Sequence, residues 1–356
     1  MSHVVGMSRV SLIFTVWNEE AALPALLRSL EAQDRQPDEI VIADGGSTDG
    51  TVPLLRDFAA ARQHSVMPAE AGVQSHIVLL ELPGANIAEG RNAAIRAATG
   101  DIVAVTDAGV TLPNYWLEEL VRPFEDRPDV NMVSGYSRPD PRTRFEELLA
   151  VTTLPLVSEI REASYLASSR TVAFRRELWG KAAGYPEWLD YCEDVVFDFN
   201  CKAVGAHVVF QPAASVRFRP RPHLKAFFLQ YYRYARGDGK ANLWPGRHAL
   251  RYTAYVLGSV LLWRGRQNPL WWALLALAIV AGSRKPLLRA LTDPASRNKK
   301  SLVSSFGSIL LIRVVGDIAK MLGYPVGVWW RWRLRQGRRL RQRRRLRHRR
   351  RLRRGQ

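Results

Sequence analysis

Two short acidic segments of this 356-residue chain have the residue types and spacing that chemistry requires. In the first, Asp44 ends an apolar run at residues 40–43 and is followed by a glycine-rich turn at residues 45–50. A carboxylate at a strand end can accept hydrogen bonds from a base or ribose, and glycines let a ligand approach the backbone. In the second, Glu193 and Asp194 form a carboxyl pair that can supply a general base. Together the segments predict an enzyme that holds a nucleotide at one carboxylate and deprotonates an acceptor at another.

Each segment, taken alone, also has a purely structural interpretation. An aspartate before glycines commonly forms a turn, and Ser47 or Asp49 would cap the helix that follows. Asp194 would likewise cap a helix over residues 195–203. No Gly-x-Gly-x-x-Gly follows the first expected strand, which argues against a dinucleotide-binding fingerprint.

The elements that position these residues alternate between two periodicities. Apolar runs bounded by turn residues predict strands at residues 10–16, 39–43, 76–81, 102–106 and 130–134, with a later strand at 207–211. Helical spacing falls between the first five, at residues 21–33, 51–62, 87–98 and 113–124. This alternation predicts an α/β fold with a mainly parallel sheet flanked by helices. Ligands bind beyond the carboxyl ends of such strands, where residues 15–19, Asp44 and Asp107 are expected.

Charge and cysteine content limit the classes of protein. The net charge is +19, but residues 331–356 hold fifteen arginines and no acid, which leaves +4 for residues 1–330. Cys192 and Cys201 cannot form a disulfide framework, and no further Cys or clustered His indicates a zinc site, so a reducing cytosol is expected. The seven-residue apolar run at 10–16 is soon followed by acids, which predicts a first strand rather than a secretory signal.

The composition becomes apolar after residue 244. Apolar stretches cover residues 252–263, 269–282 and 301–312, and none reaches the ~20 residues that cross a bilayer comfortably. They are either core helices or short, tilted or interfacial membrane helices, and tryptophans beside arginines favour the membrane. The dense like-charge tail predicts disorder. Three interpretations of the tail stay open: a solvated segment, a basic segment that binds anionic lipid, or a segment that binds nucleic acid. The absence of aromatic residues between the arginines disfavours nucleic-acid binding.

Several motifs in register resemble the family 2 glycosyltransferases of GT-A fold, over about residues 8–240. The motifs lie, in chain order, at residues 15–20, 44–51, 90–94, 106–109, 192–194 and 230–234. The apolar C-terminal region is similar to members that act on lipid or polysaccharide at the cytosolic membrane face. The expected organisation is a GT-A-like domain at residues 1–245, a membrane-associated helical region at 246–330 and the arginine-rich tail at 331–356.

On the donor side, the resemblance implies roles for five residues. Thr15 and Glu19 would line the nucleotide pocket, and Asp44 would meet the base. Arg91 would approach the nucleotide or its diphosphate, although it could instead be a helix-surface arginine. Asp107 would contact the ribose and help to hold a divalent cation, as the first acid of an Asp-x-Asp signature.

On the acceptor side, the resemblance implies that Asp194 is the general base and that Glu193 orients the site. Gln230, Arg233 and Tyr234 resemble the Gln-x-x-Arg-Trp element of processive polysaccharide synthases, with Tyr in place of Trp. That element holds the leaving diphosphate at the acceptor end.

The expected metal site departs from the family pattern. Gly109 replaces the second acid of Asp-x-Asp, and arginines stand where many relatives carry a histidine. Mg²⁺ or Mn²⁺ prefers several oxygen ligands, so a site with one carboxylate is weak. The hypothesis is that Arg217, Arg219 or Arg221 supplies part of the positive charge that the leaving diphosphate needs; the alternative is that they contact lipid headgroups or solvent.

The expected function is transfer of a sugar from a nucleotide-sugar donor to a lipid-linked or polysaccharide acceptor, with inversion and with Asp194 as base. The expected location is the cell membrane, with the catalytic domain in the cytosol and the tail on an anionic membrane surface. Two alternatives stay open: an inactive basic scaffold that binds membrane or nucleic acid, and a nucleotidyltransferase that attacks phosphorus.

Overall fold

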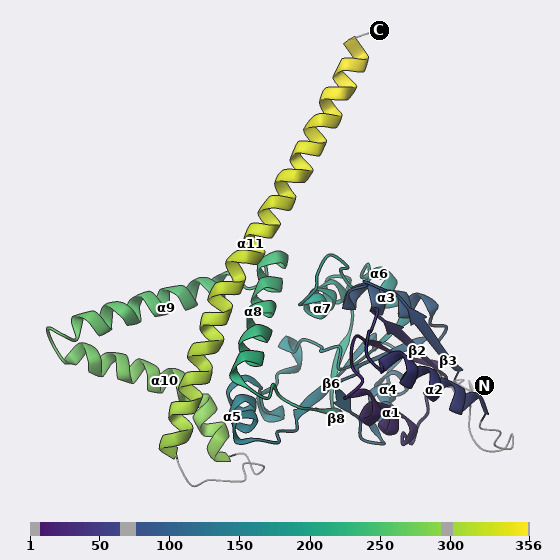
Figure 1. Cartoon of the computed structure of the whole chain (residues 1–356), viewed down its shortest axis with the longest axis horizontal. Helices are drawn as coiled ribbons and strands as arrows, with labels where there is room; N and C mark the ends of the chain where they lie inside the picture. Colours follow the sequence, from purple (N-terminus) through teal and green to yellow (C-terminus); the bar gives the residue numbers. More distant parts are fainter. Residues whose placement is uncertain (1–7, 65–75, 293–301, 355–356) are drawn as a thin grey trace. The chain divides into compact units, whose positions relative to one another are not determined.

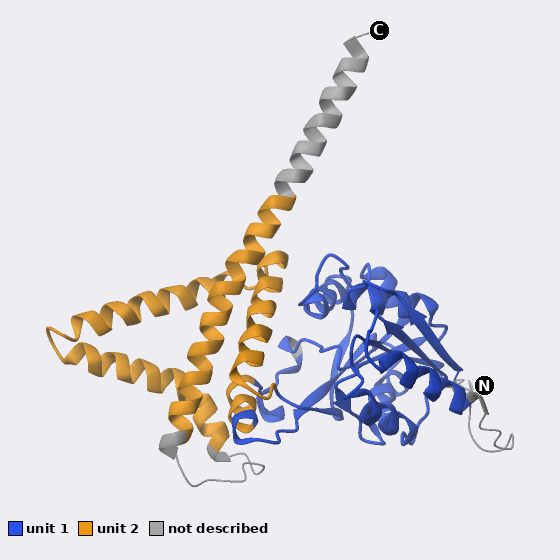
Figure 2. Ribbon diagram, viewed as in Figure 1, with its two compact units in different colours: residues 1–146, 154–220 blue, residues 147–153, 221–356 orange. Residues whose placement is uncertain are grey.

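A computed structural model of the chain describes residues 8–64, 76–292 and 302–354 (Figure 1). The chain forms two compact units, coloured separately in Figure 2. The first comprises Met1–Glu146 and Leu154–Pro220, and the second comprises Glu147–Thr153 and Arg221–Gln356. Each unit is described below by itself.

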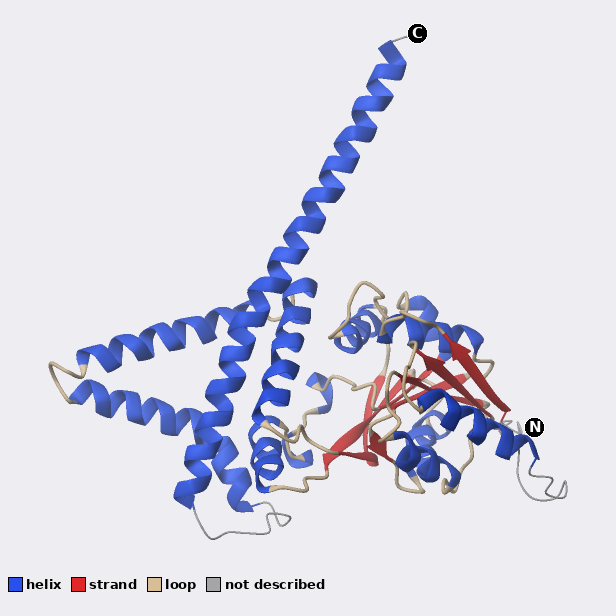
Figure 3. Ribbon diagram, viewed as in Figure 1, coloured by secondary structure: helices blue, strands red, loops and turns tan. Residues whose placement is uncertain are grey.

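The first unit is built on a mixed sheet in the order β3-β2-β1-β4-β7-β6-β8-β5 (Figure 3). Its strands are β1 (Val10–Val16), β2 (Glu39–Asp44), β3 (His76–Glu81), β4 (Ile102–Asp107), β5 (Val110–Thr111), β6 (Met132–Pro139), β7 (Thr171–Arg175) and β8 (Val208–Phe218). The first four run parallel, as the sequence predicts. The sequence does not predict β7, which pairs antiparallel with both β4 and β6. Its five residues are too few for periodicity to separate a strand from a short helix.

Helices cover both faces of this sheet. They are α1 (Leu23–Glu31), α2 (Thr51–His64), α3 (Ile87–Ala97), α4 (Trp116–Asp126), α6 (Arg176–Lys181) and α7 (Glu193–Ala203), while α5 (Arg144–Thr153) joins the two units. Neighbouring residues of β1 enter different cores: Leu12 and Phe14 pack in the cluster that contains α1 and α4 residues, and Ile13 packs in the other. Side chains alternate across a strand, so a central strand buried on both faces needs a continuous apolar run.

The second unit is helical, with α8 (Leu224–Ala241), α9 (Pro245–Arg264), α10 (Leu270–Thr292) and α11 (Leu302–Arg354). Glycines let α8 and α11 lie side by side: a Cβ on Gly327 would fall 2.1 Å from the Arg236 carbonyl oxygen. The side chains of α11 are described as far as Leu334, so the expectation for the arginine-rich tail largely lies outside them.

One prediction about the apolar stretches is wrong. Within the described residues, Leu270–Ala290 is a helix long and apolar enough, by length and composition, to cross a membrane. The uncharged stretch was expected to end at Gly282, but the helix continues through Arg284 and Lys285 into further apolar residues. Charged residues lower the local hydropathy but do not break helical hydrogen bonds. The end of the uncharged stretch is therefore not the end of the helix.

Candidate active site

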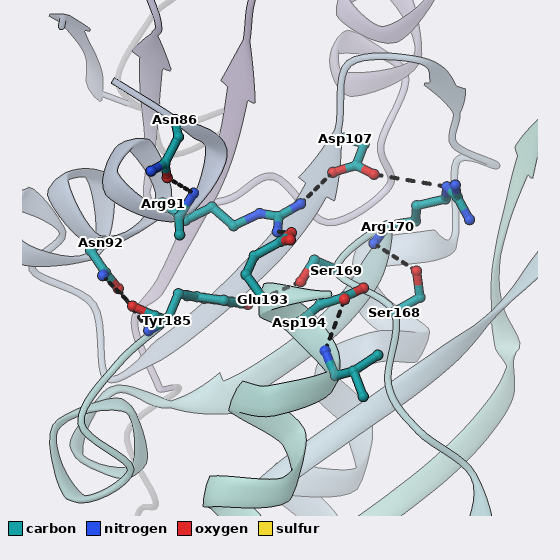
Figure 4. A network of polar contacts seen from close by, with 12 residues as sticks. Asn86, Arg91, Asn92, Asp107, Ser168, Ser169, Arg170, Tyr185, Glu193 and Asp194 are labelled. Carbon is teal, nitrogen blue, oxygen red and sulfur yellow. Dashed lines mark hydrogen bonds and ion pairs between the residues drawn. The ribbon is translucent and has the colours of Figure 1, made fainter. Parts of the chain in front are cut away.

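Arg91 connects two carboxylates that are distant in sequence (Figure 4). Its Nη2 donates to Asp107 Oδ1 at 2.9 Å, and its Nη1 donates to Glu193 Oε1 at 2.6 Å. Only 3% of the Arg91 side chain is exposed. The alternative of a helix-surface arginine is therefore wrong, and α3, the end of β4 and the first turn of α7 meet at this residue.

Local features of α3 explain why Arg91 reaches the edge of the sheet. Asn86 caps the helix and forms a capping box with Glu89, which fixes where the helix begins. A Cβ on Gly90 would lie 3.1 Å from Thr15 Cγ2, so glycine allows the helix to approach β1 closely. Asn92 then accepts from the Tyr185 backbone nitrogen at 2.9 Å and holds the segment before α7.

The second oxygen of Asp107 faces an arginine that sequence reasoning missed. Arg170 Nε lies 3.8 Å from Asp107 Oδ2. Thr106 pairs with Thr171 in the β4–β7 ladder, so Asp107 and Arg170 occupy the next opposed positions. Thr106 Oγ1 donates to the Arg170 carbonyl oxygen at 2.9 Å, and the guanidinium lies 4.6 Å from the centre of the Phe218 ring. The signal that could have found Arg170 is this strand register, which requires β7 to be recognised first.

Glu193 and Asp194 open α7 but have different surroundings. Cys192 precedes them with φ of 66°, and Glu193 turns to Arg91. Asp194 is half-buried, and its Oδ1 accepts from the Val195 backbone nitrogen at 2.8 Å. The helix begins at Glu193 with Cys192 as its N-cap, so the alternative in which Asp194 caps a helix over residues 195–203 is wrong. The role of Asp194 as general base stays a prediction.

The surroundings of Glu193 and Asp194 raise the pKa values of both carboxyl groups. Burial, together with the negative charge of Asp194, raises the pKa of Glu193 to about 7, against the effect of Arg91. Burial also raises the pKa of Asp194, while the charge of Arg91 lowers it; more weakly, Asp107 raises it and Arg170 lowers it. The charges of Arg91, Asp107 and Arg170 therefore all act on Asp194. A carboxylate with a raised pKa is a stronger base while it remains ionised.

Asp44, Thr15 and Glu19 lie at the same carboxyl edge of the sheet as Asp107. Thr15 pairs with Asp107 on one side, and Val16 pairs with Asp44 on the other. The Asp44 carboxylate accepts from the Gly46 and Ser47 backbone nitrogens, which corresponds to the structural turn interpretation. The Glu19 backbone nitrogen donates to Thr51 Oγ1 at 2.8 Å. Nucleotide contacts by these residues stay predictions.

The residues offer little to a divalent cation. Across the described parts of the chain, no group of three or more His, Cys, Asp or Glu residues is arranged to hold a metal ion. A Cβ on Gly109 would meet nothing within 4 Å, so the position of the missing second acid is open space. Asp107 is the one carboxylate of the signature, and its two oxygens face Arg91 and Arg170. Since a hard cation prefers several oxygens, this donor set fits it poorly.

The three arginines suggested by the sequence have other surroundings. Arg219 ion-pairs with the fully buried Glu146 at 2.7 Å. Arg217 lies on β8 opposite Thr111, and Arg221 belongs to the second unit.

Gln230, Arg233 and Tyr234 lie on α8 in the second unit. Gln230 Nε2 donates to the Tyr234 hydroxyl at 2.8 Å, one helical turn away. Their acceptor-side role stays a prediction.

Comparison with known proteins gives consistent matches. Residues 11–179 match the profile described as glycosyl transferase family 2. The chain is 22% identical over 228 residues to the O-antigen chain rhamnosyltransferase RfbN of Salmonella typhimurium, which covers 62% of this chain and 70% of that protein. It is 26% identical over 243 residues to the succinoglycan biosynthesis protein ExoA of Rhizobium meliloti, covering 64% and 68% of the two chains.

Two further matches differ in extent. The undecaprenyl-phosphate 4-deoxy-4-formamido-L-arabinose transferase of Serratia proteamaculans is 35% identical over 137 residues, covering 36% of this chain. This chain spans only 38% of that relative. Among solved structures, the mannosyltransferase PcManGT from Pyrobaculum calidifontis superposes with a TM-score of 0.53 at 22% identity, over 89% of this chain and 88% of that one. This likeness supports the fold.

Proposed function

Residues 11–179 of this chain are a family 2 glycosyltransferase domain of GT-A fold, and from this we propose that the chain transfers a sugar from a nucleotide-sugar donor to a lipid-linked or polysaccharide acceptor. The observation that carries the proposal is the junction of Asp107, Arg91 and Glu193 at the carboxyl edge of the parallel strands, directly beside Asp194. Nucleotides bind at this edge in open α/β sheets.

In the proposed reaction, Asp194 accepts the proton of the acceptor hydroxyl while that oxygen attacks the anomeric carbon. The bond from the anomeric carbon to the diphosphate oxygen breaks, and the nucleoside diphosphate leaves with its electron pair on the opposite side, which inverts the configuration. Asp194 suits this role because its surroundings raise its pKa. Arg91 orients the site by fixing Glu193, the neighbour of Asp194.

The acceptor class is proposed from the relatives. One carries undecaprenyl-phosphate in its name, and the other two are named for O-antigen and succinoglycan. The names refer to extended glycans or to a lipid carrier, which favours an acceptor held at a membrane.

Association with the cytosolic face of the cell membrane is part of the proposal. In the most apolar window of Leu270–Ala290, 11% of the residues are buried, which a soluble core helix would not tolerate. Exposed apolar side chains continue on α9, where Leu250 is 70% exposed. The arginines of the tail would remain in the cytosol and contact anionic headgroups.

A divalent cation is compatible with a site of this fold, since PcManGT was solved in complex with GDP-Man and Mn²⁺. In this chain Asp107 is the one carboxylate of the signature, and the donor set around it fits such a cation poorly.

The test is a screen of nucleotide-sugars with the full chain purified in detergent, run beside Asp194→Asn. We expect donor hydrolysis or transfer by the native chain and a fall of about 10²- to 10⁴-fold in acceptor-dependent turnover for the variant. Equal turnover by Asp194→Asn would remove Asp194 from the role of base. Release of pyrophosphate would indicate a nucleotidyltransferase, and no thermal stabilisation by UDP or GDP would indicate an inactive scaffold.

A further inference from the structure

The departure of a nucleoside diphosphate places negative charge at the edge of the sheet, and some positive group must offset it. The single carboxylate of Asp107 and the glycine at position 109 give a metal ion few ligands. Two guanidinium groups instead face that carboxylate. The question is which of them a diphosphate can reach.

Arg91 is already committed within the protein. Its guanidinium makes close contacts of 2.9 Å and 2.6 Å with two carboxylates, and 3% of its side chain is exposed. Because so little of the Arg91 side chain is exposed, a diphosphate has poor access to it, and displacing either carboxylate would leave a buried charge unpaired.

Arg170 differs from Arg91 in its contact with Asp107 and in its exposure. Its contact with Asp107 is longer, at 3.8 Å, and 27% of its side chain is exposed. Its backbone is held by Thr106, and its guanidinium rests over Phe218, so the group is held in place before any ligand arrives. Such pre-organised charge is effective for stabilising a transition state, because it needs no rearrangement during the reaction.

We propose that Arg170, rather than a divalent cation, is the main positive group that binds and neutralises the donor diphosphate; this rests on the proposed glycosyl transfer. As the bond from the anomeric carbon to the diphosphate breaks, the electron pair passes to the diphosphate oxygen, and Arg170 donates hydrogen bonds to the phosphate oxygens. The acceptor proton passes to Asp194, so the products are the glycosylated acceptor and a nucleoside diphosphate. The sequence suggested Arg217, Arg219 or Arg221 as the source of this positive charge, and the proposal assigns it to Arg170 instead.

The first experiment measures binding of UDP and GDP to the full chain by calorimetry, with excess EDTA and with Mn²⁺. For the native chain we expect the affinity of the nucleotide that binds to change by less than about threefold between the two conditions. Arg170→Gln should weaken it by about tenfold or more, as expected for loss of a hydrogen bond to a charged group. Arg170→Lys should retain part of the affinity, because it keeps the charge but loses the planar fork.

The matched control is Arg122→Gln. Arg122 also pairs with carboxylates in the first unit, but its side chain is 45% exposed on α4. We expect no change in nucleotide affinity for this variant. Far-ultraviolet circular dichroism of each variant separates loss of binding from loss of folding, and Arg170→Lys serves as the test if Arg170→Gln does not fold.

A second variant works in the opposite direction. The open space at Gly109 should accept an aspartate, and Gly109→Asp should make nucleotide binding respond to Mn²⁺. Native binding that disappears in EDTA, or unchanged affinity in Arg170→Gln, would overturn the inference about Arg170. If neither nucleotide binds under any condition and no sugar is transferred, the proposed function itself is overturned.

Discussion

Arg91 and Glu193 form an ion pair of 2.6 Å between residues 102 positions apart, and both side chains are more than nine-tenths buried. Arg91 also holds Asp107, so one guanidinium fixes the end of β4 relative to the start of α7. The resemblance implies that Arg91 approaches the nucleotide, which stays a prediction; the structure shows two carboxylate partners of Arg91 within the protein.

Replacing Arg91 by alanine should destabilise the first unit by about 3–5 kcal/mol, because it leaves buried carboxyl groups without their cation. Thermal or urea unfolding of the full chain, followed by circular dichroism, measures this. The matched control is Arg96→Ala on the same helix, whose pair with Glu187 is also 2.9 Å but largely exposed. That change should cost about 0–1 kcal/mol. Equal losses for the two variants would contradict the structural role of Arg91.

Stability should depend on pH through Glu193. Its pKa in the folded chain is raised from 4.5 to about 7, so between these values the folded state binds more protons than the unfolded state. The unfolding free energy should therefore be greatest below about pH 4.5 on account of this group and decline as pH rises through about 7. Between about pH 4.5 and 7, the unfolding free energy of Glu193→Gln should change less steeply with pH than that of the native chain. Equal slopes for the two proteins, measured by urea unfolding, would refute the raised pKa of Glu193.

The packing of α8 on α11 should fail when a glycine between them is enlarged. A Cβ on Gly323 would fall 2.2 Å from the Tyr232 carbonyl oxygen, so Gly323→Leu should destabilise the second unit by about 1–3 kcal/mol. Limited proteolysis in detergent, with the fragments identified by mass, measures the effect.

Gly307 provides the control on the same helix. A Cβ there meets nothing within 4 Å. Gly307→Ala should therefore leave proteolysis unchanged or slow it, since alanine favours helix by about 1 kcal/mol. If Gly323→Leu and the native chain are cleaved at similar rates, the packing of α8 on α11 does not need the close approach of their backbones at Gly323.

Membrane association should depend on the exposed face of α10. Leu277 is 65% exposed there, and a charge at this position is costly in hydrocarbon. Leu277→Asp should reduce cosedimentation with phosphatidylglycerol-containing vesicles by about tenfold or more, if a charge costs ~2.5–3.5 kcal/mol in the bilayer. Val204→Asp, on a 47% exposed apolar residue of the first unit, should bind as the native chain does. Equal binding by both variants would place the contact elsewhere.

Much of the first unit could be predicted from local pattern. The strands predicted at residues 10–16, 39–43, 76–81 and 102–106 form β1 to β4, with boundaries within one residue. Asp107 follows from the same pattern, because the carboxyl end of a parallel strand is set by where the apolar run stops. The helix over residues 195–203, named in the structural alternative for Asp194, begins two residues earlier, at Glu193.

Only the tertiary structure decided what these side chains meet. Arg170 faces Asp107 because β7 pairs antiparallel with β4 across more than sixty residues, and no local periodicity encodes that register. The partner of Arg91 is Glu193 because α3 and α7 converge on the same strand end. Hydrophobic pattern specifies which face of an element is buried, but the choice between partners of like charge depends on distances and burial that exist only in the folded chain.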